Sequence, residues 1–224
     1  MQRDVTISVI IPTLNEESLV ENAIRSAANA DQVIVVDGGS RDQSVSLAKQ
    51  AGAIVIESEQ GRGEQLRKGA EVATGDVLLF LHADSWLGEL AIQQLREKSE
   101  STRAFHGCFR QRIDDPRFRY RIMETGNALR ATWLSTPYGD QAQFVDRGTY
   151  DTVGGIDAMP LMEDVLLSRK LHRVGRPTLL DGPVNLSARH WNRRGMVRQT
   201  IKNWSILGAF CLGVSPVKLA RWYR

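Results

Sequence analysis

The first ninety residues alternate between short apolar runs and segments with helical periodicity. Four runs have the length and the β-branched or leucine-rich composition of buried strands: VTISVII (5–11), QVIVVDGG (32–39), AIVIES (53–58) and DVLLFLHAD (76–84). Helices are predicted between them, over residues 15–30, 42–52 and 63–75. Strands that alternate with helices predict parallel pairing and a sheet covered on both faces. The expected fold class is therefore α/β, with a mostly parallel central sheet flanked by helices.

Beyond residue 90 the pattern is weaker but still predicts regular elements. Helices are expected over residues 88–101 and 162–175 and strands over 104–113 and 177–191, whereas residues 142–155 predict a strand followed by a turn. We find no internal repeat and no low-complexity linker. The simplest organisation is one domain over residues 1–191, followed by a basic, aromatic helical tail over residues 192–224.

Charge is unevenly distributed along the 224 residues. The net charge is only +3, but no acidic residue follows Asp181. The basic residues of this last segment are Arg189, Arg193, Arg194, Arg198, Lys202, Lys218, Arg221 and Arg224. Such a field favours anionic partners, namely phosphates, anionic lipid or nucleic acid. Because the chain has no recognisable nucleic-acid-binding module, we expect no nucleic-acid partner.

The cysteines and the apolar runs indicate where in the cell the protein is located. Cys108 and Cys211 are far apart without metal-site spacing, which predicts a reducing environment and two small buried residues. The first residues lead directly into a strand pattern, so we expect no signal peptide. The longest apolar run, residues 204–217, is too short for a membrane span and suits a core helix or an interfacial segment. We expect a cytoplasmic protein, with a peripheral position at the inner face of the plasma membrane left open.

Polar residues follow each of the four predicted strands. Parallel α/β sheets bind ligands beyond the carboxyl ends of their strands, so these residues are expected to face one cleft. They are Pro12, Thr13, Asn15 and Glu16 after the first strand, Asp37, Gly38, Gly39 and Ser40 after the second, Arg62 in the GRGEQ segment after the third, and His82 and Asp84 after the fourth.

Each of these groups also has an ordinary structural interpretation. Asn15 could cap the following helix, and Asp37 with two glycines could form a simple turn. GRGEQ could be a flexible loop, although glycines and Arg62 beside a helix start would also suit a phosphate.

The ordered blocks SVIIPTLNEE, VVDGGSRDQS, GRGEQLRKGA, ATGDVLLFLHAD and LMEDVLLSRKL resemble the family 2 glycosyltransferases, which have the GT-A fold. The resemblance covers roughly residues 5 to 185 and is nearest to a small bacterial branch sometimes grouped with arsenosugar biosynthesis. It implies inverting transfer of a sugar from a UDP- or GDP-linked donor to an acceptor hydroxyl, with Mg²⁺ or Mn²⁺. It also implies a nucleotide-binding half over about residues 1–90 and an acceptor half over about 91–191.

The resemblance assigns roles to the strand-end residues by position. Pro12, Asn15 and Glu16 would line the nucleotide pocket, and Asp37 would contact the base. Asp84 would be the metal-binding acid. Thr13, Gly38 and Arg62 stand in the same blocks and are also expected at the donor.

His82 departs from the family pattern, which usually has Asp at this position. One aspartate suffices for Mg²⁺ or Mn²⁺ when a diphosphate and water complete the shell. His82 would then donate a hydrogen bond to the ribose or to another ligand oxygen.

The acceptor side is expected to carry the catalytic base. By resemblance the base is Asp164 of the MED block. Glu163 is adjacent and points roughly 100° away on a helix, so it would orient a loop or contact a sugar hydroxyl. Ordinary acids at a helix start remain the alternative for both. Asp140 and Gln141 could contact the sugar or acceptor, or form a turn.

The SARHW segment brings three further candidates together. Arg189 and His190 suit a diphosphate, and Trp191 suits a sugar face, whereas a surface arginine and a core tryptophan remain open. The tail could lie on an anionic membrane beside a lipid-linked acceptor, pack back on the domain or form a homodimer. A small-molecule acceptor is equally open.

Two other enzyme classes and a binding module compete with this interpretation. His82, Asp84 and His190 could form the two-His-one-carboxylate set of a non-haem iron oxygenase, but those enzymes use a jelly-roll. A sugar-1-phosphate nucleotidyltransferase would need a glycine-rich loop after the first strand, where this chain has PTLNEE. A non-catalytic module would need no acids across the cleft, yet MEDV supplies two.

Overall fold

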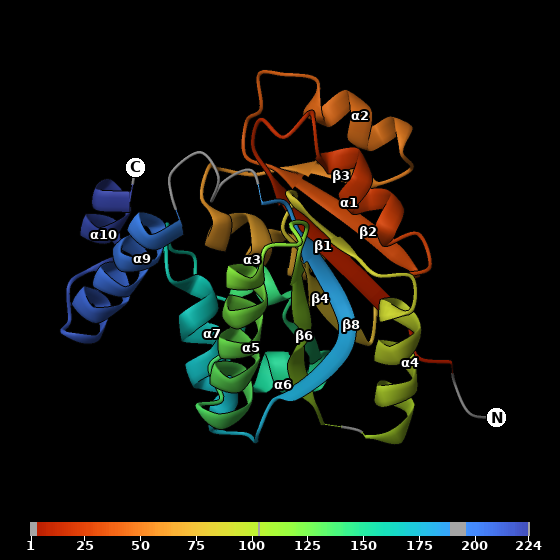
Figure 1. Cartoon of the computed structure of the whole chain (residues 1–224). Coiled ribbons are helices and arrows are strands. Elements are labelled where there is room, and N and C mark those ends of the chain that lie inside the picture. Colours follow the sequence, from red (N-terminus) through yellow and green to blue (C-terminus); the bar gives the residue numbers. More distant parts are fainter. Residues whose placement is uncertain (1–3, 103, 189–195, 224) are drawn as a thin grey trace.

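The computed structural model describes residues 4–102, 104–188 and 196–223. The first half of its sheet is parallel (Figure 1). Strands β1 (Ile7–Thr13), β2 (Gln32–Asp37), β3 (Ile54–Glu57) and β4 (Val77–Phe80) pair in the order β3-β2-β1-β4. Thr13 lies opposite Asp37, and Asp37 lies opposite Glu57. The carboxyl ends of these strands therefore meet at one edge.

The second half of the sheet is mixed. It continues in the order β7-β6-β8-β5, with β7 (Phe144–Asp146), β6 (His106–Ile113), β8 (Thr178–Leu186) and β5 (Ser85–Leu87). Strand β7 is antiparallel to β4 and β6, β5 is antiparallel to β8, and β6 and β8 are parallel. The predicted parallel arrangement therefore applies to the first half and to one pairing of the second.

Helices cover both faces of the sheet. One face packs against α1 (Val20–Ser26), α2 (Ser44–Gln50), α4 (Ala91–Ser101) and α5 (Phe118–Trp133). The other packs against α3 (Arg62–Val72), α6 (Arg147–Thr152) and α7 (Glu163–His172). Along β1 the buried residues alternate, because Val9 and Ile11 join the first cluster and Ile10 joins the second.

Two further helices follow β8. Helices α9 (Met196–Cys211) and α10 (Pro216–Tyr223) pack against each other and lie beside α7, on the side of the molecule away from α4 (Figure 1). The Arg169 guanidinium lies over the Phe210 ring and donates a hydrogen bond to Cys211 Sγ at 3.0 Å. Cys211 is exposed, contrary to expectation, whereas Cys108 is buried as predicted. In the described ranges, no helix is both long and apolar enough to cross a bilayer.

Residues 147–152 form a helix where the sequence suggested a turn. The Asp146 carboxylate accepts a hydrogen bond from the Thr149 backbone N–H at 2.9 Å and so caps α6. The remaining predicted helices and strands are confirmed with shifted ends. For example, α1 begins only at Val20, and the last strand ends at Leu186.

Candidate active site

Asp37 stands at the end of β2 with its two carboxylate oxygens in different environments. Oδ2 accepts hydrogen bonds from the backbone N–H groups of Gly39 and Ser40, both at 2.9 Å. Oδ1 is buried and has no hydrogen-bond partner among the described residues. Asp37 thus closes a turn, as one interpretation held, and also keeps one acceptor for a ligand.

Gln65 holds the ends of β1 and β2 together. Its Nε2 donates to the backbone oxygens of Thr13 at 2.9 Å and Val36 at 2.8 Å. A Cβ on Gly38 would lie 3.1 Å from the Gln65 side chain, so Gly38 lets helix α3 approach the strand ends. The sequence analysis missed Gln65, because nothing in its helical position indicates which strands it reaches.

Asn15 joins two loops and does not cap α1. Its Oδ1 accepts a hydrogen bond from Arg41 N, and its own N–H donates to Ser40 Oγ, both at 2.9 Å. Its φ of 55° is left-handed, which asparagine tolerates better than most residues. The capping interpretation is therefore wrong, since α1 begins at Val20 without a side-chain cap. Pro12 lies within β1 and is buried.

Glu16 and Asp84 form a pair of neighbouring carboxyl groups. Burial raises the pKa of Glu16 to about 7, and the charges of Asp84 and Asp42 add to this effect. A divalent cation would relieve this repulsion. Within the described residues no group of three or more His, Cys, Asp or Glu side chains could hold a metal. The pair therefore fits a cation only when substrate oxygens complete the coordination shell. Mg²⁺ sites commonly combine one or two carboxylates with substrate phosphates in this way.

His82 borders Gly139, whereas Asp84 lies near Glu16. A Cβ on Gly139 would lie 2.9 Å from His82 Nε2 and 3.2 Å from Asp164 Oδ2, so both side chains border this glycine. Asp164 Oδ2 accepts a hydrogen bond from Gly139 N at 2.7 Å. The segment after β4 therefore presents Asp84 toward the β1–α1 loop and His82 toward the start of α7.

Glu163 is fully buried and forms an ion pair with Arg62. Its Oε1 accepts from Arg62 Nε, whereas its Oε2 has no hydrogen-bond partner in the described part of the chain. The structure thus joins Arg62, at the start of α3, to the start of α7. Glu163 and Asp164 point to different partners, as their adjacent helical positions predict.

Asp140 and Gln141 belong to the short 3₁₀-helix η1 (Gly139–Gln141). Burial raises the pKa of Asp140, although Arg130 and His82 act against this effect. Gln141 Oε1 accepts from Arg130 Nη2 at 2.9 Å and from Tyr138 N at 3.2 Å. Gln141 therefore shapes the turn, and Asp140 is held close to His82.

Unsatisfied buried polar atoms concentrate at these residues. Six such side-chain atoms occur in the described part of the chain. Four of them belong to candidate residues: Asp37 Oδ1, Asp140 Oδ1, Gln141 Nε2 and Glu163 Oε2. Left-handed non-glycine residues also adjoin the site, namely Asn15, Ala142 and Met162. Orphaned polar atoms and strained backbone gather at functional sites, because ligands can satisfy the atoms.

Three of the candidates cannot be placed. Arg189, His190 and Trp191 lie outside the described residues.

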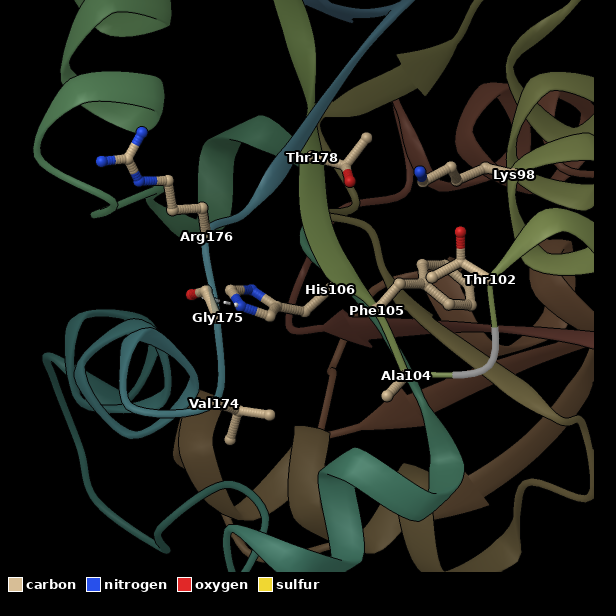
Figure 2. Close-up of a pocket in the computed structure, with 9 residues that line it drawn as sticks. All are labelled: Lys98, Thr102, Ala104, Phe105, His106, Val174, Gly175, Arg176 and Thr178. Atoms are coloured by element: carbon tan, nitrogen blue, oxygen red, sulfur yellow. Dashed lines mark hydrogen bonds between the residues drawn. The ribbon is translucent and has the colours of Figure 1, made fainter.

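A separate cavity of about 150 Å³ lies at the other end of the sheet, around the start of β6 and β8 (Figure 2). Among its lining residues, His106 is buried, and its Nε2 lies 3.1 Å from Gly175 O. The Lys98 and Arg176 side chains stand on opposite sides of the hollow and do not converge (Figure 2). None of the residues discussed above lines it.

Residues 8–160 match the model of glycosyl transferase family 2. This chain belongs to that family. Glucosyl-3-phosphoglycerate synthase of Mycobacterium tuberculosis is 36% identical over 93 residues, which cover 35% of this chain and 29% of the relative. Undecaprenyl-phosphate 4-deoxy-4-formamido-L-arabinose transferase of an Enterobacter species is 29% identical over 149 residues, with 60% and 46% covered. The matches thus span less than half the length of either relative.

Solved structures support the fold. TarS of S. aureus in complex with UDP superposes with a TM-score of 0.66 at 18% identity, over 81% of this chain and 60% of that one. Glucosyl-3-phosphoglycerate synthase of M. tuberculosis with Mn²⁺, UDP and phosphoglyceric acid gives 0.58 at 22%, over 82% and 69%. The predicted GT-A fold is confirmed. The oxygenase alternative is wrong, because the sheet is covered by helices and the family is one of glycosyltransferases. Family membership likewise favours glycosyl transfer over the nucleotidyltransferase alternative.

Proposed function

We propose that this chain transfers a sugar from a UDP- or GDP-linked donor to an acceptor hydroxyl with inversion, assisted by Mg²⁺ or Mn²⁺. The observation that carries the proposal is that the segment after β4 links two acidic groups: its Asp84 acts on Glu16 in the β1–α1 loop, and its His82 borders Gly139, whose N–H binds Asp164. Among the described residues, orphaned acceptors occur in both parts, namely Asp37 Oδ1 and Glu163 Oε2. The UDP, Mn²⁺ and UDP-sugar complexes of the structural relatives support it. A non-catalytic binding module would not require acidic residues on both sides of the strand ends.

On the donor side, the strand ends bind and orient the nucleotide. Asp37 Oδ1 accepts a hydrogen bond from the base, and the loop that Asn15 ties together encloses the nucleoside. Asp84, with Glu16 beside it, holds the cation. The bound cation supplies Lewis-acid stabilisation of the leaving diphosphate. Arg189 and His190 remain candidates for the diphosphate, and Trp191 for the sugar face.

On the acceptor side, Asp164 takes the proton from the acceptor hydroxyl. Its carboxylate is oriented by Gly139 N–H and by its place at the start of α7, whose buried Val165 and Leu171 anchor the helix. The remaining acceptors, Asp140 Oδ1 and Glu163 Oε2, are placed to bind hydroxyl groups of the sugar or acceptor. His82 lies beside Asp164 and so acts on this side of the reaction.

The acceptor is a lipid-linked or small hydroxyl compound. The formamido-arabinose transferase relative carries a lipid phosphate in its name, and the synthase relative a phosphoglycerate. A position at the cytoplasmic face of a membrane would give the enzyme access to a lipid-linked acceptor. A homodimer is compatible with a lipid-linked and with a small acceptor.

A donor screen tests this proposal. We expect UDP or GDP to raise the melting temperature by roughly 5–10 °C at a hundred times its dissociation constant, with Mn²⁺ present. A panel of UDP- and GDP-sugars should then show slow nucleotide release that chelation abolishes. If no nucleotide stabilises the protein with or without Mn²⁺, the proposed function is wrong.

A further inference from the structure

Exposed large apolar side chains concentrate on three helices of the molecule. In the described part of the chain there are fourteen such residues, and ten of them belong to α5, to α9–α10 or to the residue directly after one of these helices. Monomeric proteins rarely expose apolar side chains in groups of this size without a partner.

Helix α5 has one apolar face without a partner. Phe118, Ile122, Leu129 and Trp133 are spaced by four, seven and four residues, which places them within about 60° of one another on a helix. All four are exposed, Trp133 to 82%, and Leu134, the residue directly after the helix, is exposed as well but lies off this face. The buried residues of the same helix, such as Tyr120, lie on the opposite side and pack on the sheet.

Helices α9 and α10 expose a second set. Ile201 and Trp204 are neighbours on α9, and Trp204 is 73% exposed. Leu212, Val217 and Trp222 are exposed at the turn and along α10. The inward residues Ile206 and Leu219 are buried. The helices are thus packed in place, with tryptophans left facing outward.

The charge of these helices selects the occupant. No acid occurs in α9 or α10, whereas Lys218 and Arg221 are exposed and Arg119 is exposed on α5. These three cations form no ion pair with any described residue. A matching surface therefore combines negative charge with an apolar layer, and tryptophan favours the boundary between the two.

We propose that the outward residues of α5 and α9–α10, here called the docking surface, bind the surface of an anionic lipid bilayer. A second copy of the chain fits less well, because a two-fold interface would set these cations against themselves. The contact is peripheral, since no described helix crosses a bilayer. The docking does not depend on the proposed function.

The docking surface adjoins the acceptor side of the site. Helix α5 leads into η1, whose Gly139 borders Asp164. Helix α9 contacts α7, which begins with Glu163 and Asp164. Docking would therefore bring the start of α7 near the bilayer, where a lipid-linked hydroxyl compound would be held.

Vesicle flotation of the full chain tests the proposal. Vesicles of phosphatidylcholine with about one-third phosphatidylglycerol should carry the protein up the gradient, and the bound fraction should fall with salt. Pure phosphatidylcholine should bind at least about tenfold more weakly. Failure to float with anionic vesicles at low salt would overturn the proposal and leave the transferase activity untouched.

Paired variants assign the contact to residues. Phe118→Ser with Trp133→Ser, and separately Trp204→Ser with Trp222→Ser, should each lower the partition coefficient about tenfold. Lys218→Glu with Arg221→Glu should do the same through charge. The matched control is Ile54→Ser with Leu90→Ser, which removes exposed apolar residues elsewhere and should leave binding unchanged.

Two readouts separate the remaining outcomes. Nucleotide release without vesicles should be the same in all variants, so lost flotation with retained turnover supports docking. Sedimentation velocity identifies the rival occupant. If the native protein is a dimer and the tryptophan variants are monomers, the surface joins two copies and the bilayer proposal is wrong.

Discussion

In residues 1–90, the proposed nucleotide-binding half, β1 to β4 are parallel and the candidate side chains stand at or after the strand ends. In the rest of the domain, the proposed acceptor half, the strands are mixed, and the candidates come from η1 and the start of α7. There a network of side chains fixes their positions: Gln143 Nε2 donates to Pro137 O at 2.9 Å and to Ser168 Oγ at 2.8 Å. The first half places its residues at strand ends, which Gln65 holds together, and the second places them on η1 and α7, which Gln143 holds together.

The proposed function adds a division of labour to this contrast, with donor binding in one half and proton transfer in the other. Asp164→Asn keeps the shape of the side chain and removes the proton acceptor. We expect a loss of roughly 10²- to 10⁴-fold in turnover, with donor affinity retained. Released nucleotide measures the first, and calorimetry with UDP or GDP and Mn²⁺ measures the second.

The exposed Asp151→Asn on α6 is the matched control and should behave as the native protein. Loss of donor binding in Asp164→Asn would show that the two halves share the donor. Full turnover would move the base elsewhere, with Asp140 the next candidate.

Asp84→Asn tests the other half. The substitution removes the Asp84 carboxylate beside Glu16, so the cation loses a ligand. We expect the affinity for the nucleotide in Mn²⁺ to fall by at least roughly tenfold. With chelator present, native and variant protein should bind equally. The measurement is calorimetric affinity in both conditions. An unchanged affinity in Mn²⁺ would mean that the cation, if used, is held by other groups.

Two buried glutamines, one in each half, sharpen the comparison. Gln65→Leu and Gln143→Leu each remove two or more buried hydrogen bonds, which costs about 1–3 kcal/mol per variant, or roughly 2–12 °C in melting temperature. Gln65→Leu should also weaken donor binding, whereas Gln143→Leu should lower turnover by displacing η1 and α7. Thermal melts, donor affinity and turnover of both variants check this. The same functional defect in both would erase the distinction between the halves.

The nucleotide-binding half could be predicted well from sequence. Its strands are continuous apolar runs, and parallel strands meet at one edge, so Asp37 and the segment that carries Asp84 could be placed at the same edge of the sheet by topology alone. Contacts across the sheet could not be predicted. The spacing of Gln65 says that it lies on a helix, but only the crossing of α3 over β1 and β2 shows what it bonds.

The acceptor half was predicted less well for physical reasons. Helix α5 carries arginines and glycine among its apolar residues, so its periodicity is diluted, although Phe118, Ile122, Leu129 and Trp133 do lie on one face. This apolar face of α5 points to solvent, so packing within the domain does not indicate what it contacts. His82 was expected at the donor by its place in the chain. Its position beside Gly139 and Asp164 follows from η1, a short element without a sequence signal.

We expect acid to lower the stability of the proposed acceptor half through His106. Burial lowers the pKa of this histidine below its usual value, and its Nε2 lies 3.1 Å from Gly175 O, which ties β6 to the segment after α7 (Figure 2). Between the ordinary histidine pKa of about 6.5 and the lower folded value, the unfolded chain binds the additional proton. Stability contributed by neutral His106 is therefore complete above about pH 6.5 and is lost as the pH falls through this window.

Melting temperatures from pH 8 to pH 5 should show this fall in the native protein and a shallower one in His106→Gln. The exposed His172 also lowers the pKa of His106, although less than burial does, so His172→Gln should give a slope between those of the native protein and His106→Gln. Equal slopes in all three proteins would mean that the acid sensitivity of this half lies in its carboxylates instead.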